Sequence, residues 1–143
     1  MLTVEGEVEK PREFAEADLR GLSEQIVDVS TIVPKRQGTA VWLRSLLAAA
    51  GLKSSARFAT LASGDGTFAI CVPLKPLLDR GVLLYAVDGA PLPEGKGGPV
   101  RVLLTGEVPC EGVAEQLDAC AMVKGLARVR VTAEREPDVG HEH

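Results

Sequence analysis

The amino-acid sequence predicts an α+β domain, in which a mixed β-sheet with hairpins packs against a few short helices. Short segments alternate between apolar and polar residues, which is the period-2 pattern of half-buried strands. Strands and helices do not alternate regularly, as they would in a doubly wound sheet. The sequence Ser-Gly-Asp-Gly at residues 63–66 lies between two β-prone runs and predicts a hairpin.

The first half of the chain contains four predicted elements. Residues 2–8 and 25–33 alternate as strands do, and residues 15–19 form a short helical segment. A longer helix is expected over residues 40–50, with Thr39 as its N-cap and Gly51 in a left-handed C-terminal cap. Its apolar residues have the spacing of one buried helix face: Leu43, Leu46, Leu47 and Ala50.

The second half continues with short strands and helices. The expected strands cover residues 57–62, 67–72, 82–87, 100–105 and 126–133, and the expected helices cover residues 73–80 and 113–122. No internal repeat or linker divides the chain. The prediction is one domain over residues 1–133, followed by a polar C-terminal tail over residues 134–143.

Composition excludes several classes of function. The 143 residues suffice for one domain with a real core. The net charge of −4 disfavours binding to nucleic acid, and the 3% of aromatic residues gives few platforms for stacking bases. No apolar run approaches the ~20 residues of a membrane span, and no basic region precedes an apolar stretch at the N-terminus. We therefore expect a cytoplasmic protein.

Cysteines and histidines are few. Cys71, Cys110 and Cys120 form no CxxC pair, which is typical of reduced thiols, and Cys71 lies in an apolar run that predicts a core position. Both histidines, His141 and His143, lie in the polar tail. A Ser-His-Asp or Cys-His set therefore cannot be assembled inside the domain. We assign no catalytic residue and no metal ligand.

Six motifs follow one another in an order that resembles the molybdopterin-binding domain of the sulfite oxidase family. They are GEVEKPREFAEADL (6–19), GTAVWLRSLLAAAGL (38–52), SGDGTFAICVPL (63–74), LLYAVDGAPLP (83–93), GGPVRV (97–102) and VKGLARV (123–129). The resemblance covers nearly the whole chain. It implies the fold of that domain and molybdopterin as the cofactor.

The resemblance also implies a set of cofactor-binding residues. Arg101 and Lys124 occupy the positions at which the family holds the pterin cofactor. The cofactor ends in a phosphate, to which an arginine offers bidentate donors and a lysine a point charge. Lys96, Gly97 and Gly98 form a loop that could add backbone N–H groups, although enzymatic members usually carry a histidine at the position of Lys96. The simpler alternatives are a solvated Arg101 and a helix stop at Lys124.

One departure from the family bears directly on activity. Family enzymes bind molybdenum through a cysteine thiolate between the second strand and the leucine-rich helix, but residues 30–38 contain no cysteine and are fewer than in those enzymes. The hydroxyls of Ser30 and Thr31 are not equivalent to a soft thiolate. Cys110 or Cys120 is the remaining route to a thiolate ligand. Residues 106–119, which follow Arg101, are expected to be helical rather than a cofactor-covering loop.

Three functions remain, in this order of preference. The first is a module that binds a pterin or another phosphorylated small anion without molybdenum redox catalysis. The second is a structural or partner-binding domain on the same fold, with a protein partner that the sequence does not identify. The third is a molybdenum oxidoreductase of the sulfite oxidase type with an atypical metal ligand.

Overall fold

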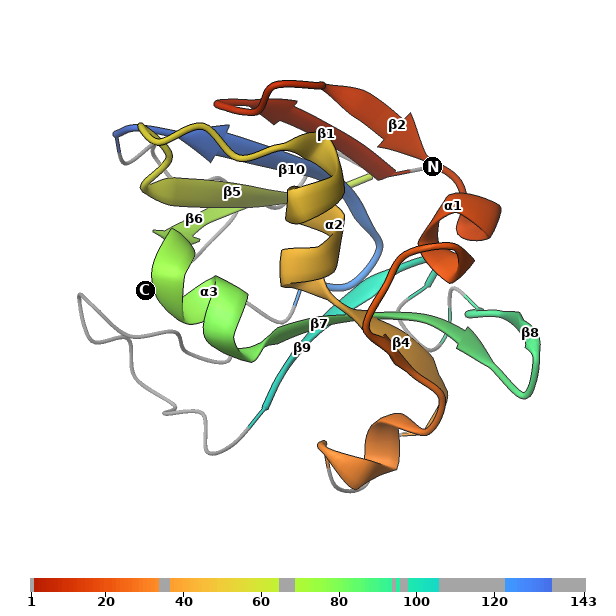
Figure 1. Ribbon diagram of the computed structural model, residues 1–143. Helices are drawn as coiled ribbons and strands as arrows, with labels where there is room; N and C mark the ends of the chain where they lie inside the picture. The colour runs from red at the N-terminus through yellow and green to blue at the C-terminus, as the bar shows by residue number, and fades with distance from the viewer. Residues whose placement is uncertain are drawn as a thin grey trace.

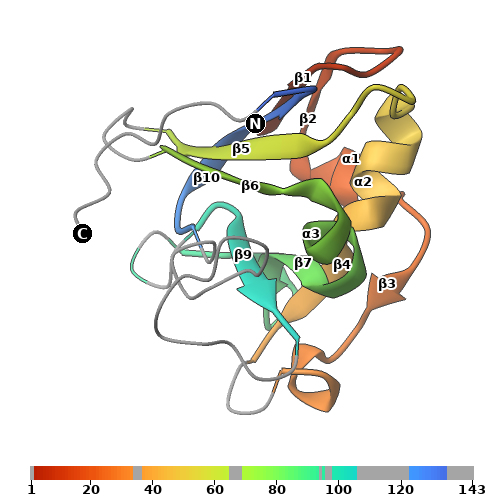
Figure 2. The ribbon, with the colours of Figure 1, turned by 90° about the vertical axis from the view of Figure 1, so that its left-hand side faces the viewer.

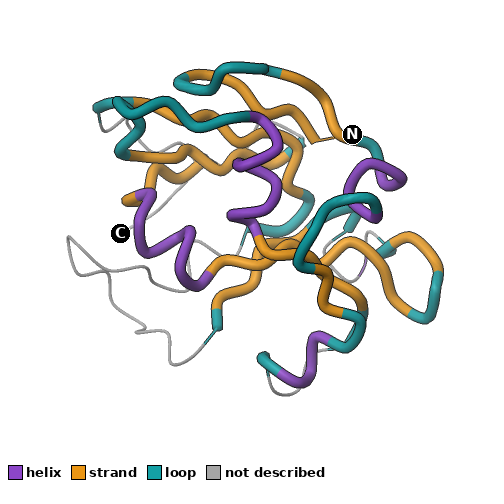
Figure 3. Tube along the Cα trace, viewed as in Figure 1, coloured by secondary structure: helices purple, strands orange, loops and turns teal. Residues whose placement is uncertain are grey.

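Two β-sheets and three short α-helices form the described part of the computed structural model (Figure 1). The structure describes residues 2–33, 37–64, 69–93, 95, 98–105 and 123–134. Helices and strands are mixed along the chain, as Figure 3 shows, so the predicted α+β class is confirmed. Within these residues, no helix is long and apolar enough to cross a membrane.

The first sheet joins the two ends of the described chain. Its order is β2-β1-β10-β5-β6, in which β1 and β10 are parallel and the other neighbours are antiparallel. Its strands are β1 (Leu2–Gly6), β2 (Arg12–Phe14), β5 (Phe58–Ser63), β6 (Ala69–Pro73) and β10 (Leu126–Thr132).

The second sheet is built around β7, whose seven residues are all buried. One side of β7 pairs with β4, which in turn pairs with β3, and the other side pairs with β8 and β9. The strands are β3 (Gln25–Ile26), β4 (Thr39–Trp42), β7 (Gly81–Val87), β8 (Ala90–Pro91) and β9 (Arg101–Leu104). Both faces of this sheet are apolar, so it separates two hydrophobic clusters.

The main core fills the space between the two sheets, while a smaller cluster covers the opposite face of the second sheet. We call this smaller cluster the second core. Its buried members are Ile26, Val29, Ala40, Val82, Leu84, Val87, Leu92 and Leu103. The alternation of side chains explains the division along β4 and β9, and along β7 from Val82 to Tyr85, because neighbouring residues point to opposite faces.

The helices are α1 (Glu16–Arg20), α2 (Leu43–Ala50) and α3 (Leu74–Arg80), and the two views show α2 between the edges of the two sheets (Figures 1 and 2). The four predicted face positions of α2 are fully buried. Gly51 has φ +80 at the C-cap, as predicted, and its N–H donates to the carbonyls of Leu47 and Ala48. This cap satisfies carbonyls that the end of a helix leaves open.

Two predicted elements were partly wrong. Residues 39–42 form strand β4 and not the first turn of a helix, because Thr39, Val41 and Trp42 are β-prone residues that pair with β7. The expected strand over 25–33 ends at Ile26, because the Asp28 side chain caps a 3-10 turn at Val29–Thr31. The short strand β2 was not predicted. The predicted helix at 113–122 and the hairpin tip lie outside the described residues.

Cys71 is buried, but it does not belong to either apolar cluster. Its β6 neighbours Ile70 and Val72 belong to the main core, and Cys71 is paired with Thr60 on β5. Because strand residues alternate, Cys71 lies on the face of the first sheet that is turned away from the main core. This thiol therefore does not face the space between the two sheets.

A glycine at residue 6 is required by the close pairing of β1 and β10. Gly6 has φ +93, and a Cβ there would collide with the carbonyl oxygen of Val131. We expect Gly6→Ala to lower the free energy of unfolding by about 2–4 kcal/mol in urea denaturation, because it adds a backbone clash to an unfavourable φ. Gly89→Ala is the matched control: Gly89 has φ +78 with open space around it, and should cost only about 1 kcal/mol. Equal losses for the two variants would contradict the role of the clash.

Candidate functional site

Arg101 and Lys124 are brought together by backbone pairing. The N–H of Val102 donates to the carbonyl of Val123 at 2.9 Å, and the N–H of Leu126 donates to the carbonyl of Val100 at 2.8 Å. The two hydrogen bonds flank Arg101 on one segment and Lys124 on the segment that is paired with it. The fold therefore places the two predicted cationic residues opposite one another, although they are 23 positions apart in the sequence.

Arg101 lies at the margin of the second core. It is paired with Leu84, which is paired with Ala40, and both of these apolar residues belong to the second core. The Arg101 side chain is half-buried and its Nε atom is buried, whereas Lys124 is exposed. A guanidinium that is partly removed from water attracts an anion more strongly than a solvated one, because the local dielectric is lower. Of the two residues, Arg101 has the environment that is better suited to hold an anion.

Gly98 is buried beside this pair and has a packing role of its own. Its N–H donates to the carbonyl of Pro93 at 2.9 Å, and a Cβ on Gly98 would collide with the carbonyl oxygen of Leu92. The peptide bond that follows, to Pro99, is cis. The close approach of the chain at 92–93 thus explains this glycine without a ligand. Lys96 and Gly97, the other predicted members of the loop, lie outside the described residues.

The described part of the interval in which family enzymes carry their metal-binding cysteine begins in the 3-10 turn Val29–Thr31, which Asp28 caps. Asp28 Oδ1 accepts hydrogen bonds from the Ser30 N–H at 3.0 Å and the Ser30 Oγ at 2.6 Å, and the Thr31 hydroxyl donates to the Asp28 carbonyl at 2.8 Å. The hydrogen bonds from Ser30 lower the pKa of the Asp28 carboxyl, so it is ionised at neutral pH. Both hydroxyls that could replace the thiolate are therefore engaged with Asp28.

This turn lies on the same face of the second sheet as Arg101. Val29, inside the turn, is fully buried in the second core together with Leu84, and its N–H donates to the carbonyl of Gly38 at 2.9 Å. The two parts of the predicted cofactor site, the cysteine-free interval and the cationic pair, thus both border the second core. Sequence spacing alone did not predict that they share a face.

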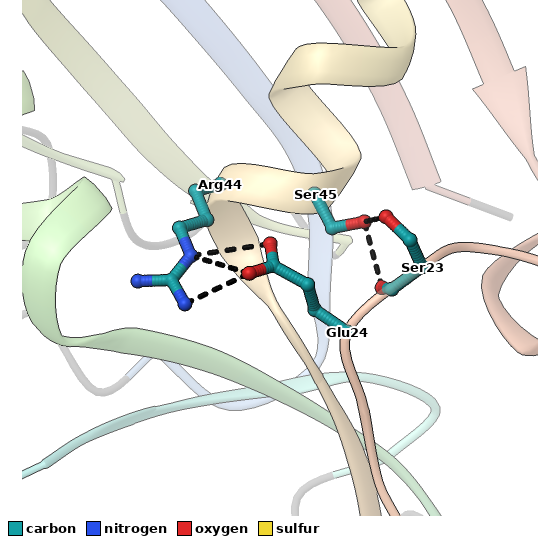
Figure 4. Close-up of polar contacts among 4 residues, drawn as sticks. All are labelled: Ser23, Glu24, Arg44 and Ser45. Atoms are coloured by element: carbon teal, nitrogen blue, oxygen red, sulfur yellow. Dashed lines mark hydrogen bonds and ion pairs between the residues drawn. The ribbon is translucent and has the colours of Figure 1, made fainter.

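The segment that leads into the turn is held by polar contacts to α2 (Figure 4). Arg44 donates to both carboxylate oxygens of Glu24 from Nε and Nη2 at 2.9–3.1 Å, and its guanidinium stacks 4.6 Å from the centre of the Trp42 ring. The Ser45 hydroxyl donates to the Ser23 carbonyl at 2.8 Å. Glu24 has φ +59, so these contacts hold a backbone conformation that a glutamate rarely adopts.

Two contacts in and around this turn were not predicted from the sequence: the Asp28 cap and the ion pair between Glu24 and Arg44. The Asp-x-Ser pattern at residues 28–30 is a signal for a side chain that caps its own turn, and it could have predicted where the strand ends. The ion pair between Glu24 and Arg44 joins residues 20 positions apart and gave no local signal.

The structure places no thiolate or metal cluster at this site within its described ranges. Cys71 is on β6 in the other sheet, and Cys110 and Cys120 lie outside those ranges. Among the residues described, no three histidine, cysteine, aspartate or glutamate side chains are grouped as metal ligands would be. The site is therefore cationic at Arg101 and Lys124, with Asp28 as the acidic group of the neighbouring turn.

Comparison with known proteins supports the resemblance found in the sequence. Residues 1–139 match the family model of the oxidoreductase molybdopterin binding domain. A search of curated proteins gave no match.

The fold is similar to that of a solved enzyme structure. The crystal structure of the sulfane dehydrogenase SoxCD from Paracoccus pantotrophus superposes with a TM-score of 0.65 at 19% sequence identity. The match covers 94% of the present chain and 38% of the other chain. The shared fold is thus established for nearly all of this chain, which spans well under half of that longer one.

The ion pair between Glu24 and Arg44 predicts a specific pH dependence of stability. The hydrogen bond from Arg44 lowers the pKa of Glu24 from 4.5, so the stabilisation is present above that pH and is lost as the pH falls through the lowered pKa. We expect Glu24→Gln to be less stable than wild type at about pH 7, and the difference to shrink towards about pH 3.

Urea denaturation at both pH values measures this effect. Glu13→Gln, at an exposed position of strand β2, controls for the general loss of one carboxylate. A difference between Glu24→Gln and wild type that stays constant with pH would show that the ion pair is not its source.

Proposed function

The chain belongs to the oxidoreductase molybdopterin-binding domain family, and we propose that it binds a pterin or another phosphorylated small anion at Arg101 and Lys124, without molybdenum redox catalysis. The observation that supports this proposal best is the backbone pairing that sets the half-buried Arg101 opposite the exposed Lys124. Two cations on two paired segments concentrate positive charge locally, although the whole chain has a net charge of −4.

The chemistry of these residues suits the phosphate end of a molybdopterin. A guanidinium such as that of Arg101 donates charged hydrogen bonds to a phosphate, and Lys124, which is exposed, would add a further donor. Lys96 and Gly97 precede Gly98 in the chain and would extend the set of donors. When bound, the cofactor would supply a dithiolene-bearing pterin, and the role of these side chains is to hold its phosphate and orient it.

Molybdenum itself does not fit the interval in which the family places its ligand. The interval contains no thiol, and the hydroxyls of Ser30 and Thr31 both donate hydrogen bonds at Asp28. A hydroxyl is also a harder ligand than a thiolate. We therefore assign this chain no step that passes through the metal, and we assign no catalytic residue.

The main alternative is a structural or partner-binding domain on the same fold. The packing role of Gly98 favours it, since it explains one of the predicted site residues without a ligand. A catalytic protein with Cys110 or Cys120 as an atypical ligand is the other alternative. We propose a cytoplasmic location with no nucleic-acid or membrane partner.

Pterin content tests the proposal directly. The protein is purified from a bacterial host that makes molybdopterin, denatured and oxidised, and its pterin fluorescence and its molybdenum and tungsten contents are measured. We expect pterin without stoichiometric metal. Arg101→Ala should weaken binding by roughly 1.5–3 kcal/mol, because a charged hydrogen bond is lost, and should reduce the pterin that is retained.

Arg12→Ala serves as the matched control, because Arg12 is an exposed arginine on β2 in the other sheet. Its pterin content should equal that of wild type. Pterin together with metal would support the catalytic alternative and direct attention to Cys110 and Cys120. Neither pterin nor metal, or equal pterin in Arg101→Ala and wild type, would sink the proposed role of Arg101.

A further inference from the structure

A cavity of about 60 Å³ lies on the main-core side of the second sheet, away from the face that carries Arg101. Its floor is formed by buried residues from four parts of the chain, and its rim by the partly or fully exposed Glu16, Pro91 and Pro99. The floor residues are Leu2, Phe14, Leu19, Tyr85 and Val100. The cavity is therefore a pocket between α1, β1, β2 and the β7–β8 region that opens at the surface.

The volume of this pocket exceeds that of a single bound water molecule. One water needs roughly 10–15 Å³. The pocket is several times larger. It is also less than half of the roughly 150 Å³ engineered cavity that admits benzene. Because the pocket opens at the surface, part of an occupant can remain outside it, and a small molecule of about five non-hydrogen atoms suits this space.

The walls favour an apolar occupant over water. Four of the five floor side chains carry only carbon and hydrogen beyond the backbone, and a buried water needs two to four polar partners. The charges at the mouth are balanced, because Arg20 lies 3.4 Å from the Glu16 carboxylate as an ion pair. Burial of a net charge on this floor would be costly. The occupant is therefore neutral and mostly apolar.

Tyr85 is the one floor residue with a polar side-chain atom, and hydrogen bonding holds that atom in place. Gln25 Nε2 donates to the carbonyls of Leu19 and Leu22 at 2.6 and 3.0 Å, which fixes Gln25 Oε1 as an acceptor. The Tyr85 hydroxyl must then donate to Gln25 Oε1, and its oxygen retains a lone pair as an acceptor. Burial raises the pKa of the Tyr85 phenol, so it stays neutral.

We infer that this pocket is a binding site for a small neutral molecule that has a compact apolar body and one hydroxyl or N–H group. The apolar body would pack against Leu19, Phe14 and Val100, and the polar hydrogen would be donated to the Tyr85 oxygen. The site lies on the opposite face of the sheet from Arg101 and does not depend on the anion site. A short branched alcohol such as isobutanol has the required size and chemistry.

Isobutanol titration of the whole isotope-labelled chain, followed by amide and methyl NMR spectra, tests this inference. We expect saturable shifts that centre on Leu19, Tyr85 and Val100, with a Kd on the order of millimolar, and nuclear Overhauser contacts between the isobutanol methyl groups and these residues. Isobutyrate, a charged molecule of similar size, should give no saturable shifts there.

Three variants identify the pocket as the site. Val100→Leu extends a floor side chain into the pocket and should weaken isobutanol binding at least tenfold, whereas Val27→Leu, the same change at an 82% exposed position, should leave it unchanged. Tyr85→Phe should weaken binding about three- to tenfold, because one hydrogen bond is lost. Arg101→Ala should bind isobutanol as wild type does, which separates this result from the fate of the anion site.

The absence of saturable shifts in wild type at about 100 mM isobutanol would overturn the inference. So would nuclear Overhauser contacts to residues elsewhere, and this measurement on the wild-type chain remains decisive if Val100→Leu does not fold. Binding that persists unchanged in a folded Val100→Leu variant would likewise exclude the pocket as the site.

Discussion

The backbone hydrogen bonds of residues 123–126 hold the two sheets together at the place where the candidate site is formed. Val123 and Leu126 form hydrogen bonds with Val102 of β9 and with Val100, which precedes β9 in the second sheet. The carbonyl of Gly125 accepts a hydrogen bond from the N–H of Gly64, at the end of β5 in the first sheet, at 2.9 Å. The chain then continues directly into β10. Because one short turn satisfies backbone groups of both sheets, its position is fixed by the fold, and Lys124 within it is fixed opposite Arg101.

Two physical effects act in opposite directions at Arg101: the cost of burying its charge and the attraction of that charge to an anion. Its row on the second sheet contains Ala40 and Leu84, so the side chain begins in an apolar environment, where a charge is costly to bury. Half-burial at the margin of the second core limits this cost, since part of the residue remains exposed to solvent. The same partial burial strengthens the attraction to an anion. Lys124 alone, which is exposed, would contribute little in salt-containing water.

The sequence allowed the fold class, the helix-face pattern of α2 and most strands to be predicted, because these features depend on local periodicity. The buried run of β7 and the alternation in β10 are examples. What could not be predicted depends on contacts between distant residues. Thr39–Trp42 became a strand because β7 was available to pair with it, and the ion pair of Glu24 with Arg44 exists only after α2 has folded against residues 23–24. Arg101 and Lys124 were predicted as cofactor-binding residues from the family resemblance. Their position opposite one another became known only from the structure.

The turn at Asp28 supports the proposal that this domain binds its ligand without molybdenum. A metal ligand usually couples binding to folding, because the ligand-bearing segment is ordered by the metal. Here the Asp28 carboxylate accepts hydrogen bonds from the N–H and the hydroxyl of Ser30, and the Asp28 carbonyl accepts one from the Thr31 hydroxyl. Val29 packs in the second core and anchors the turn there. The local hydrogen bonds and the buried valine thus stabilise this segment without a metal. A domain built in this way can keep its fold, and with it the Arg101–Lys124 pair, whether or not molybdenum is present. That independence is what a binding module on this fold requires.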